Sequence, residues 1–527
     1  MPSYQTGAAG GPVVGATIAA SVLAAMYVAS GVTGTDLAAQ AARAEFFHLH
    51  GPRPVDFGWY GGVFPYGYSL LTGPLNAAVG ARWVGALAAV VGAAAFAYLL
   101  VKTQVRRPLL GGLLGAACMV FDVVSGRTTF AVGLALGLLA LCLLPRGRPA
   151  GARPSAGARR SAAVAGMAAL SAGASPVAGV FLVIAGLALT ITGRRLCGVL
   201  LMAGSAAPLL LIAMVFSDGG FSPFSAGQAA VFVVLTTAVA VAVPGRYLAV
   251  RVGAVLTAVT LIAGHLAQTP LGGNTARLPL LFAIPIVAAT AELPGVALAI
   301  VIAAMLWWQP PLVTSDVTSA GARGTRAAFF SPLVDQLQRR QPLGRIEIVP
   351  LRDHWEAAYV AESVVPVARG WERQADVGRN RLFYSGALTA PSYWAWLRDN
   401  AVAMVAVPRG QRLDPAGVRE GTLVGTGLPY LQLAWSSADW RLYTVRDAQR
   451  MVSPPGRMMA SDAAGVTFTT DRPARLMLRL RFSRWVTLFG PAGACLGPRL
   501  GWTSVTVTRA GRYRVSSTWH LRPSRRC

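Results

Sequence analysis

Charged side chains are scarce in this chain: only 13% of its 527 residues are charged, whereas 54% are hydrophobic. An ordinary soluble domain carries about 25% charged residues. Several apolar runs approach the roughly 20 residues that a helix needs to cross a bilayer. The composition therefore excludes an ordinary soluble protein and predicts one that crosses a membrane several times.

Lysine is almost absent: the 47 basic residues comprise 46 arginines and one lysine, Lys102. The net charge of +26 by itself would suit a nucleic-acid partner. Nucleic-acid binding, however, needs basic residues clustered with aromatic side chains on one surface. Many arginines here stand in short loops between apolar runs, where the positive-inside rule explains them. We therefore expect a lipid bilayer, and no nucleic acid, as the partner of these residues.

Cysteine is rare as well, and none of the five cysteines forms a CxxC pair, so no zinc or redox motif is present. The chain also lacks GxSxG, HExxH, a P-loop and a Rossmann GxGxxG with its acidic partner. Cys495 and Cys527 both fall in the polar C-terminal part. In an extracytoplasmic region they could form a disulfide, and two free thiols fit the sequence equally well.

Eleven apolar segments are predicted to span the plasma membrane: residues 12–32, 83–101, 108–123, 128–144, 161–174, 176–192, 196–216, 228–244, 252–268, 277–291 and 294–308. With a cytoplasmic N-terminus, the strongly basic short loops, including the Arg-rich loop 145–160, all fall on the cytoplasmic side. Segment 62–80 is apolar but interrupted by proline and glycine, and is predicted to be only partly embedded. Residues 1–309 are the predicted transmembrane domain, with a first outer loop at 33–66.

The tail that follows, 310–527, is predicted to lie outside the cytoplasm. Its first part, 310–455, mixes an amphipathic helical pattern at 331–340 with short buried strand patterns at 344–351 and 401–408. Its second part, 456–527, shows period-two alternation broken by Gly, Pro and Asp. We expect an α/β module followed by a small β-sandwich-like module.

Acidic residues are the scarcest feature of the membrane part. Residues 1–309 hold only six, and three of these, Asp36, Glu45 and Asp56, stand in the first outer loop. Ionisable groups in membrane proteins mark functional sites. Thr35 can cap a helix that begins at Asp36 and carries Arg43 on the same face. The alternative is structural, with Asp36 as a capping carboxylate and Arg43 as a surface charge.

The order of the following segments resembles the GT-C superfamily of integral-membrane glycosyltransferases. In that pattern a catalytic Asp follows the first span, a Gly/Pro/Tyr-rich segment lies along the outer surface, and a span then ends in a basic turn. The corresponding elements here are Asp36, residues 61–68 and residues 83–107. Segments 126–141, 175–187, 269–286, 353–384 and 388–408 are similar to the actinobacterial membrane proteins labelled 6-pyruvoyl-tetrahydropterin-synthase-related.

The resemblance implies that a sugar is transferred from a polyprenyl-phosphate-linked donor to a glycan, lipid or protein acceptor outside the cell, with Asp36 as general base. Outer-side arginines would meet the lipid phosphate, and a turn of exposed amides at 272–274 could seat an anion. Aromatic and polar residues of the tail are typical of carbohydrate contacts. The substrate-binding candidates are Arg43, Glu45, His48, Asp56, Tyr66, Arg127, Asn274, Arg277, Trp371 and Glu372.

Some GT-C enzymes hold a divalent cation, Mg²⁺ or Mn²⁺, through an acidic pair beside the catalytic Asp. No DD, ED or DxD occurs at Asp36, so no metal ligand is assigned. Two other functions remain open: a transporter or flippase of a lipid-linked precursor, and a non-catalytic envelope scaffold that binds glycan. Transporters carry internal repeats and ionisable residues at mid-bilayer, which this sequence does not favour.

Overall fold

The computed structural model describes residues 10–145, 154–267, 269–309, 314–341, 343–362, 364–519 and 525–527. Residues 146–153 of the predicted basic loop lie outside the described residues. The chain folds into two compact units. Unit 1 is Met1–Leu37, Gly67–Leu75 and Val79–Ala320, and unit 2 is Ala38–Tyr66, Asn76–Ala78 and Gly321–Cys527. This division differs from the predicted transmembrane domain, 1–309, because most of the first outer loop belongs with the C-terminal region.

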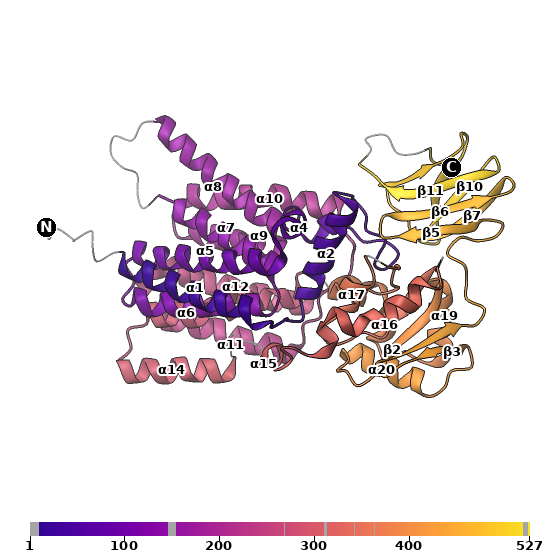
Figure 1. Ribbon diagram of the computed structural model, residues 1–527. Coiled ribbons are helices and arrows are strands. Elements are labelled where there is room, and N and C mark those ends of the chain that lie inside the picture. Colours follow the sequence, from indigo (N-terminus) through magenta and orange to yellow (C-terminus); the bar gives the residue numbers. More distant parts are fainter. Residues whose placement is uncertain are drawn as a thin grey trace. The chain divides into compact units, whose positions relative to one another are not determined.

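Unit 1 is a bundle of apolar helices (Figure 1). A helix overlaps each of the eleven predicted segments: α1 (Gly11–Ser30), α5 (Ala81–Lys102), α6 (Pro108–Val124), α7 (Thr128–Leu143), α8 (Pro154–Ala174), α9 (Pro176–Ile191), α10 (Arg195–Val215), α11 (Ala226–Ala242), α12 (Leu248–Leu266), α13 (Arg277–Thr290) and α14 (Gly295–Trp308). Among the described residues, five helical stretches are long and apolar enough to cross a membrane, those of α1, α5, α10, α12 and α13. A polytopic helical membrane part is thus confirmed, and the count of eleven spans stays a prediction.

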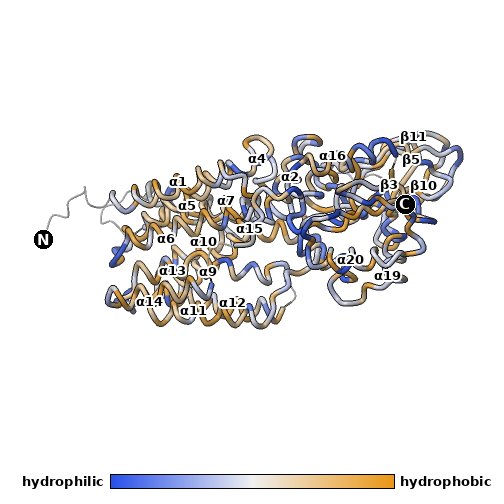
Figure 2. Tube along the Cα trace, turned by 60° about the horizontal axis from the view of Figure 1, so that its bottom comes forward, coloured by the Kyte–Doolittle hydropathy of each residue, from blue (hydrophilic) through white to orange (hydrophobic). Residues whose placement is uncertain are grey.

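The bundle is held together by small residues. Hydrophobic residues predominate along its helices (Figure 2), and lipid offers no hydrophobic force to pair them, so close backbone approach must do so. A Cβ added at Gly198 of α10 would lie 2.3 Å from the Gly186 carbonyl oxygen of α9. One added at Gly111 of α6 would lie 2.9 Å from the Pro285 carbonyl oxygen of α13. The many alanines and glycines of the sequence therefore have a packing role here.

Segment 62–80, predicted to be only partly embedded, forms two short helices, α3 (Pro65–Tyr68) and α4 (Thr72–Val79). Residues 67–75 belong to unit 1, where the Leu70 amide donates to the Gly173 carbonyl at 2.8 Å. The Thr72 and Thr129 hydroxyls are 2.8 Å apart and buried. These contacts attach a short, proline-interrupted segment to α7 and α8 without a further full-length helix.

The first half of the tail is an α/β module with one four-stranded sheet in the order β1-β2-β4-β3. Strand β1 is parallel to β2, and the other neighbours are antiparallel. The strands are β1 (Arg345–Ile348), β2 (Val402–Pro408), β3 (Leu431–Ser436) and β4 (Trp440–Val445). The helices are α15 (Thr314–Thr318, in unit 1), α16 (Ala327–Gln338), α17 (Glu356–Tyr359), α18 (Arg373–Arg379), α19 (Ala390–Asp399) and α20 (Pro415–Gly425).

The second half of the tail is a β-sandwich of two antiparallel sheets, in the orders β7-β10-β9 and β5-β6-β11-β8. Its strands are β5 (Arg457–Asp462), β6 (Gly465–Thr470), β7 (Ala474–Arg481), β8 (Val486–Phe489), β9 (Cys495–Arg499), β10 (Trp502–Val507) and β11 (Gly511–Ser517). Val55 and Phe57 of the first outer loop are buried in its core, which explains why that loop belongs to unit 2. Cys495 and Cys527 form a disulfide.

We expect this disulfide to stabilise the β-sandwich by about 3 kcal/mol, because it closes a long loop in the unfolded chain. The two cysteines are 32 positions apart. Thermal unfolding of the full chain in detergent, followed by tryptophan fluorescence, should show a lower midpoint when a reductant is added. Cys495→Ser should start at that lower midpoint and respond no further to the reductant. An equal response of both proteins would contradict the prediction.

Candidate active site in unit 1

Close backbone contacts between the first loop and the turn after α6 hold Asp36 in place. Its amide donates to the Ser125 carbonyl at 3.1 Å. A Cβ added at Gly34 would lie 2.2 Å from the Ser125 carbonyl carbon, and one at Gly126 would lie 2.2 Å from the Leu37 amide nitrogen. Gly126 also has a φ of +86°, which favours glycine. Helix α2 (Leu37–His50) begins one residue later than predicted, directly after the carboxylate.

The Asp36 carboxylate lies beside two guanidinium groups. The Arg127 Nε donates to Asp36 Oδ2 at 3.4 Å, and Arg277 Nη2 is 3.9 Å from the same oxygen. Arg127 also donates through Nη1 to Oδ1 of Asp122, which is buried in α6, at 3.0 Å. Burial alone would lower the pKa of Arg127, but the charges of Asp122 and Asp36 outweigh it and raise that pKa. The guanidinium therefore stays positively charged, with a carboxylate on two of its nitrogens.

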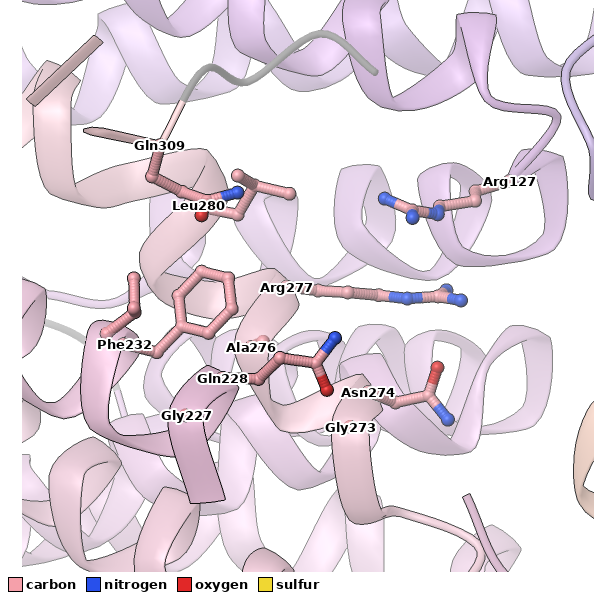
Figure 3. Close-up of a pocket in the computed structure, with 11 residues that line it drawn as sticks. Arg127, Gly227, Gln228, Phe232, Gly273, Asn274, Ala276, Arg277, Leu280 and Gln309 are labelled. Carbon is pink, nitrogen blue, oxygen red and sulfur yellow. The ribbon is translucent and has the colours of Figure 1, made fainter. Parts of the chain in front are cut away.

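A cavity of about 450 Å³ opens beside these groups (Figure 3). Its lining includes Arg127, Arg277 and three side-chain amides, those of Gln228, Asn274 and Gln309. Figure 3 shows both guanidinium groups directed into the same space, with the amides of Gln228 and Asn274 alongside. The Arg277 guanidinium lies 5.2 Å from the Phe130 ring centroid, and the structure records no hydrogen bond from it to any residue that it describes. This cavity is suited to an anion, because the Arg277 guanidinium, which has no recorded hydrogen bond to a described residue, and neutral amide donors converge there.

A second, mainly apolar cavity of about 760 Å³ lies within the same bundle. Side chains of α5, α7, α9, α12 and α13 line it, and its polar lining includes Lys102, Arg194 and Arg246. Along α13 the lining runs from Leu278 to Thr290, which corresponds to about 18 Å of helix. The lining on α13 thus starts one residue after Arg277 in sequence, and the two cavities share no lining residue.

Four predicted site residues are brought together in unit 1: Asp36, Arg127, Asn274 and Arg277. The sequence reasoning missed Asp122, Gln228 and Gln309. Asp122 could have been suspected, since it is one of the six acidic residues of the membrane part. Nothing in the sequence marked the two glutamines as site residues, because a single uncharged amide at the end of an apolar segment is common.

Arg43 is buried rather than the surface charge of the structural alternative. Its side chain is 5% exposed and donates to Oε2 of Glu372 at 2.6 Å and to the Pro65 carbonyl at 3.2 Å. Its guanidinium also lies 5.5 Å from the Trp59 ring centroid. Both predicted residues, Arg43 and Glu372, therefore join the first loop to the tail inside unit 2.

The other predicted residues of the first loop also belong to unit 2. Asp56 is buried and accepts a hydrogen bond from the Gly58 amide at 2.7 Å. Burial, followed by the charge of Asp56, raises the pKa of the neighbouring Glu362 well above its usual range. Tyr66 packs against the Phe47 and Trp519 rings, Glu45 is half-buried, and His48 is exposed.

Trp371 does not present an open face for a sugar. Its ring stacks on His354 with centroids 3.3 Å apart, and the Arg373 guanidinium lies 4.8 Å from its centroid. His354 in turn lies 3.4 Å from Glu356 and 3.6 Å from Asp414. Burial alone would lower the pKa of His354, but its contacts with the two carboxylates raise it. Trp371 therefore belongs to a buried ionic cluster, and its role as a substrate contact stays a prediction.

No protein-family model matches the chain, and no curated protein matches it. Among solved structures the chain is similar to arabinofuranosyltransferase AftD from mycobacteria, with 14% identity and a TM-score of 0.44 over 96% of this chain. This chain spans only 60% of the length of that protein. It is also similar to ArnT from Cupriavidus metallidurans bound to undecaprenyl phosphate, with 12% identity and a TM-score of 0.48 over 84% of this chain and 98% of that one.

A further similar structure is the Archaeoglobus fulgidus oligosaccharyltransferase tethered with an acceptor peptide, at 13% identity and a TM-score of 0.44 over 75% of this chain and 69% of that one. These are GT-C glycosyltransferases, the group that the sequence resembles. The pterin-synthase-related name is not confirmed. At these identities and TM-scores the likeness concerns general architecture and assigns no substrate to this chain.

A second buried ionic network lies in the α/β module of unit 2. Arg369 pairs with Asp376 at 2.7 Å and with Glu420 at 3.1 Å, and Glu347 lies 3.8 Å away. One guanidinium therefore faces three buried carboxyl groups. Burial is the main cause that raises the pKa of Glu420 to about 6 and that of Glu347 well above its usual range.

We expect unit 2 to lose stability as the pH rises from about 4.5 through 6, the window between the ordinary and the raised pKa of Glu420. The sign follows from the raised pKa values, because the folded state binds protons that the unfolded chain releases. Glu347→Gln should weaken this dependence and raise the unfolding midpoint at pH 7, measured by differential scanning fluorimetry of the full chain. Asp471→Asn, at an exposed turn, is the matched control and should leave the profile unchanged. An unchanged profile for Glu347→Gln would contradict the assignment.

Proposed function

We propose that this protein transfers a sugar from a polyprenyl-phosphate-linked donor to an extracytoplasmic cell-envelope acceptor, with Asp36 as general base. The observation that supports it is the Asp36 carboxylate beside Arg127 and Arg277, the two arginines that line an anion-suited cavity. A base for the acceptor hydroxyl and cations for a departing phosphate are the two requirements of glycosyl transfer from a phosphate.

Arg277 is the principal phosphate ligand in this proposal. Arg127 and Arg277 carry two positive charges, which the carboxylates of Asp36 and Asp122 balance. These four side chains are therefore neutral overall. Of the two guanidinium groups, only that of Arg277 has no recorded hydrogen bond to a described residue. Its planar fork can therefore take two phosphate oxygens. The amide of Asn274 lines the same cavity and can donate a further hydrogen bond.

The apolar cavity is proposed to hold the first part of the isoprenoid chain. Its lining on α13 starts at Leu278, which follows the proposed phosphate ligand in sequence, and ends at Thr290. The isoprenoid chain reaches this cavity from lipid and not from water, so its transfer adds little hydrophobic free energy. What the apolar lining contributes is selection of the chain by its shape. A phosphate at Arg277 and a chain in this cavity give the donor one orientation.

The proposed chemistry is a single displacement. The acceptor hydroxyl gives its proton to the Asp36 carboxylate as its oxygen forms a bond to the anomeric carbon. The bond between that carbon and the phosphate oxygen breaks, and the polyprenyl phosphate leaves with the electron pair. The guanidinium of Arg277 stabilises the negative charge that grows on the phosphate in the oxocarbenium-like transition state. Such a displacement inverts the anomeric configuration.

The site is proposed to face the outside of the plasma membrane, with the N-terminus in the cytoplasm. Arg127 and Asn274 stand in connections that the positive-inside rule places outside, whereas Lys102, Arg107 and Arg194 stand in connections on the cytoplasmic side. The C-terminal tail follows the last predicted span and lies outside with the acceptor.

Replacing the base should remove the activity while leaving the site intact. Asp36→Asn keeps the shape of the side chain, and we expect a loss of about 100-fold or more in turnover of lipid-linked sugar in matched membranes, because the amide cannot accept the hydroxyl proton. Asp218→Asn, an acidic residue of the same unit that does not line the cavity, should retain activity. A folded and fully active Asp36→Asn protein would disprove the role of Asp36.

Filling the apolar cavity should discriminate between donors by chain length. Gly253 lines the cavity from α12 and has its nearest neighbour, the Ala188 Cβ, 3.8 Å from an added Cβ. We expect Gly253→Phe to raise the KM for long-chain donors by about tenfold, with a smaller effect on donors of two isoprene units. Val259→Phe, at a position of the same helix that is 57% exposed, is the matched control. Equal effects on long and short donors would exclude this cavity as the chain site.

A further inference from the structure

We infer that the Arg127 guanidinium occupies the place between Asp36 and Asp122 that a divalent cation would take, so that the proposed sugar transfer requires no such cation. Only the statement that sugar transfer requires no divalent cation rests on the proposed function. The GT-C resemblance allows for a cation held by an acidic pair. The sequence shows no such pair beside Asp36, but the fold brings Asp122 to the same guanidinium from a distance of 86 positions.

The donor set at this place does not fit a cation. Asp36 and Asp122 each bond a different nitrogen of Arg127, at 3.4 and 3.0 Å. A Mg²⁺ or Mn²⁺ ion needs carboxylate oxygens at about 2.0–2.2 Å and would stand against two guanidinium groups. Among the described residues, no cluster of three or more His, Cys, Asp or Glu side chains could hold a metal ion. Arg127 therefore supplies the positive charge that stands between the two carboxylates.

The second oxygen of Asp122 shows what removal of Arg127 would leave. Oδ2 is buried and has no hydrogen-bond partner among the residues that the structure describes. With Arg127 present, one guanidinium balances this carboxylate and reaches Asp36 as well. Without it, two carboxylates would be left without their shared counter-ion, and a divalent cation is the natural replacement.

Arg127 is thus a positioning residue, which acts through Asp36. Its Nε holds Oδ2 of the proposed base, while its contact with the buried Asp122 anchors the guanidinium to α6. Arg277, by contrast, reaches Asp36 only at 3.9 Å and makes no contact with Asp122 that the structure records. The two arginines, though they line one cavity, should respond differently to truncation.

The test uses the full chain in detergent, stripped with EDTA, with Mn²⁺ binding followed by electron paramagnetic resonance. We expect the wild type to bind no Mn²⁺ that depends on Asp36, and Arg127→Ala to gain one Mn²⁺ site of about millimolar affinity or tighter. Arg127→Ala/Asp122→Asn should lose that gain, and Arg277→Ala should not acquire it. Binding of undecaprenyl phosphate should be insensitive to EDTA in the wild type. In Arg127→Ala it should be weakened by about tenfold or more and be restored by Mn²⁺.

Stoichiometric Mn²⁺ binding to the wild type that Asp36→Asn abolishes would overturn the inference, and this measurement needs no arginine variant to fold. A folded Arg127→Ala protein without a Mn²⁺ site would overturn it as well. These readouts involve no turnover. If Asp36→Asn proves fully active but Arg127→Ala gains Mn²⁺, the proposed base is wrong and the exchange of guanidinium for cation stands.

Discussion

The contact of one guanidinium with two carboxylates is the interaction on which the site in unit 1 depends. Arg127 stands directly before α7, and it joins the buried Asp122 of α6 to Asp36 of the first loop. Removing Arg127 would leave the buried carboxylate of Asp122 without its ion-pair partner, which destabilises the fold. Gly34 and Gly126 let the two backbones come close enough for this contact to form.

The α13 helix contributes residues to both cavities. Arg277 and Leu280 line the polar cavity, whereas Leu278, Phe282 and Ile286 line the apolar one. A ligand with an anionic head and a long hydrocarbon chain fits two such cavities better than a fully polar or a fully apolar molecule. The same arrangement allows the proposed phosphate site and the proposed chain site to be tested separately, since different residues line each.

The sequence predicted the helices well and the site in part. Apolar runs marked each helix of the bundle, because burial in lipid demands them, and period-two alternation marked the sandwich strands. The scarce acidic residues, the expected outer-side arginines and the GT-C resemblance led to Asp36, Arg127 and Arg277, and the turn at 272–274 led to Asn274. The structure places these four residues close together, and their role stays a prediction. Asp122 was missed, since an acidic residue near a helix end gives no local sign of its partner. Arg43 was taken either as a phosphate ligand or as a surface charge, and it is buried against Glu372.

By itself, the sequence determined that the chain crosses a membrane and where its scarce carboxylates lie along the chain. These properties follow from composition and hydrophobic periodicity, which can be read from short stretches of the sequence. Only the tertiary structure decided that the first loop is divided after Leu37, with Asp36 in the helical unit and Arg43, Asp56 and Tyr66 in the other. It also decided which carboxylates share a cation. Those outcomes depend on contacts between residues far apart in the chain, and ionic pairing over such separations leaves no periodic trace.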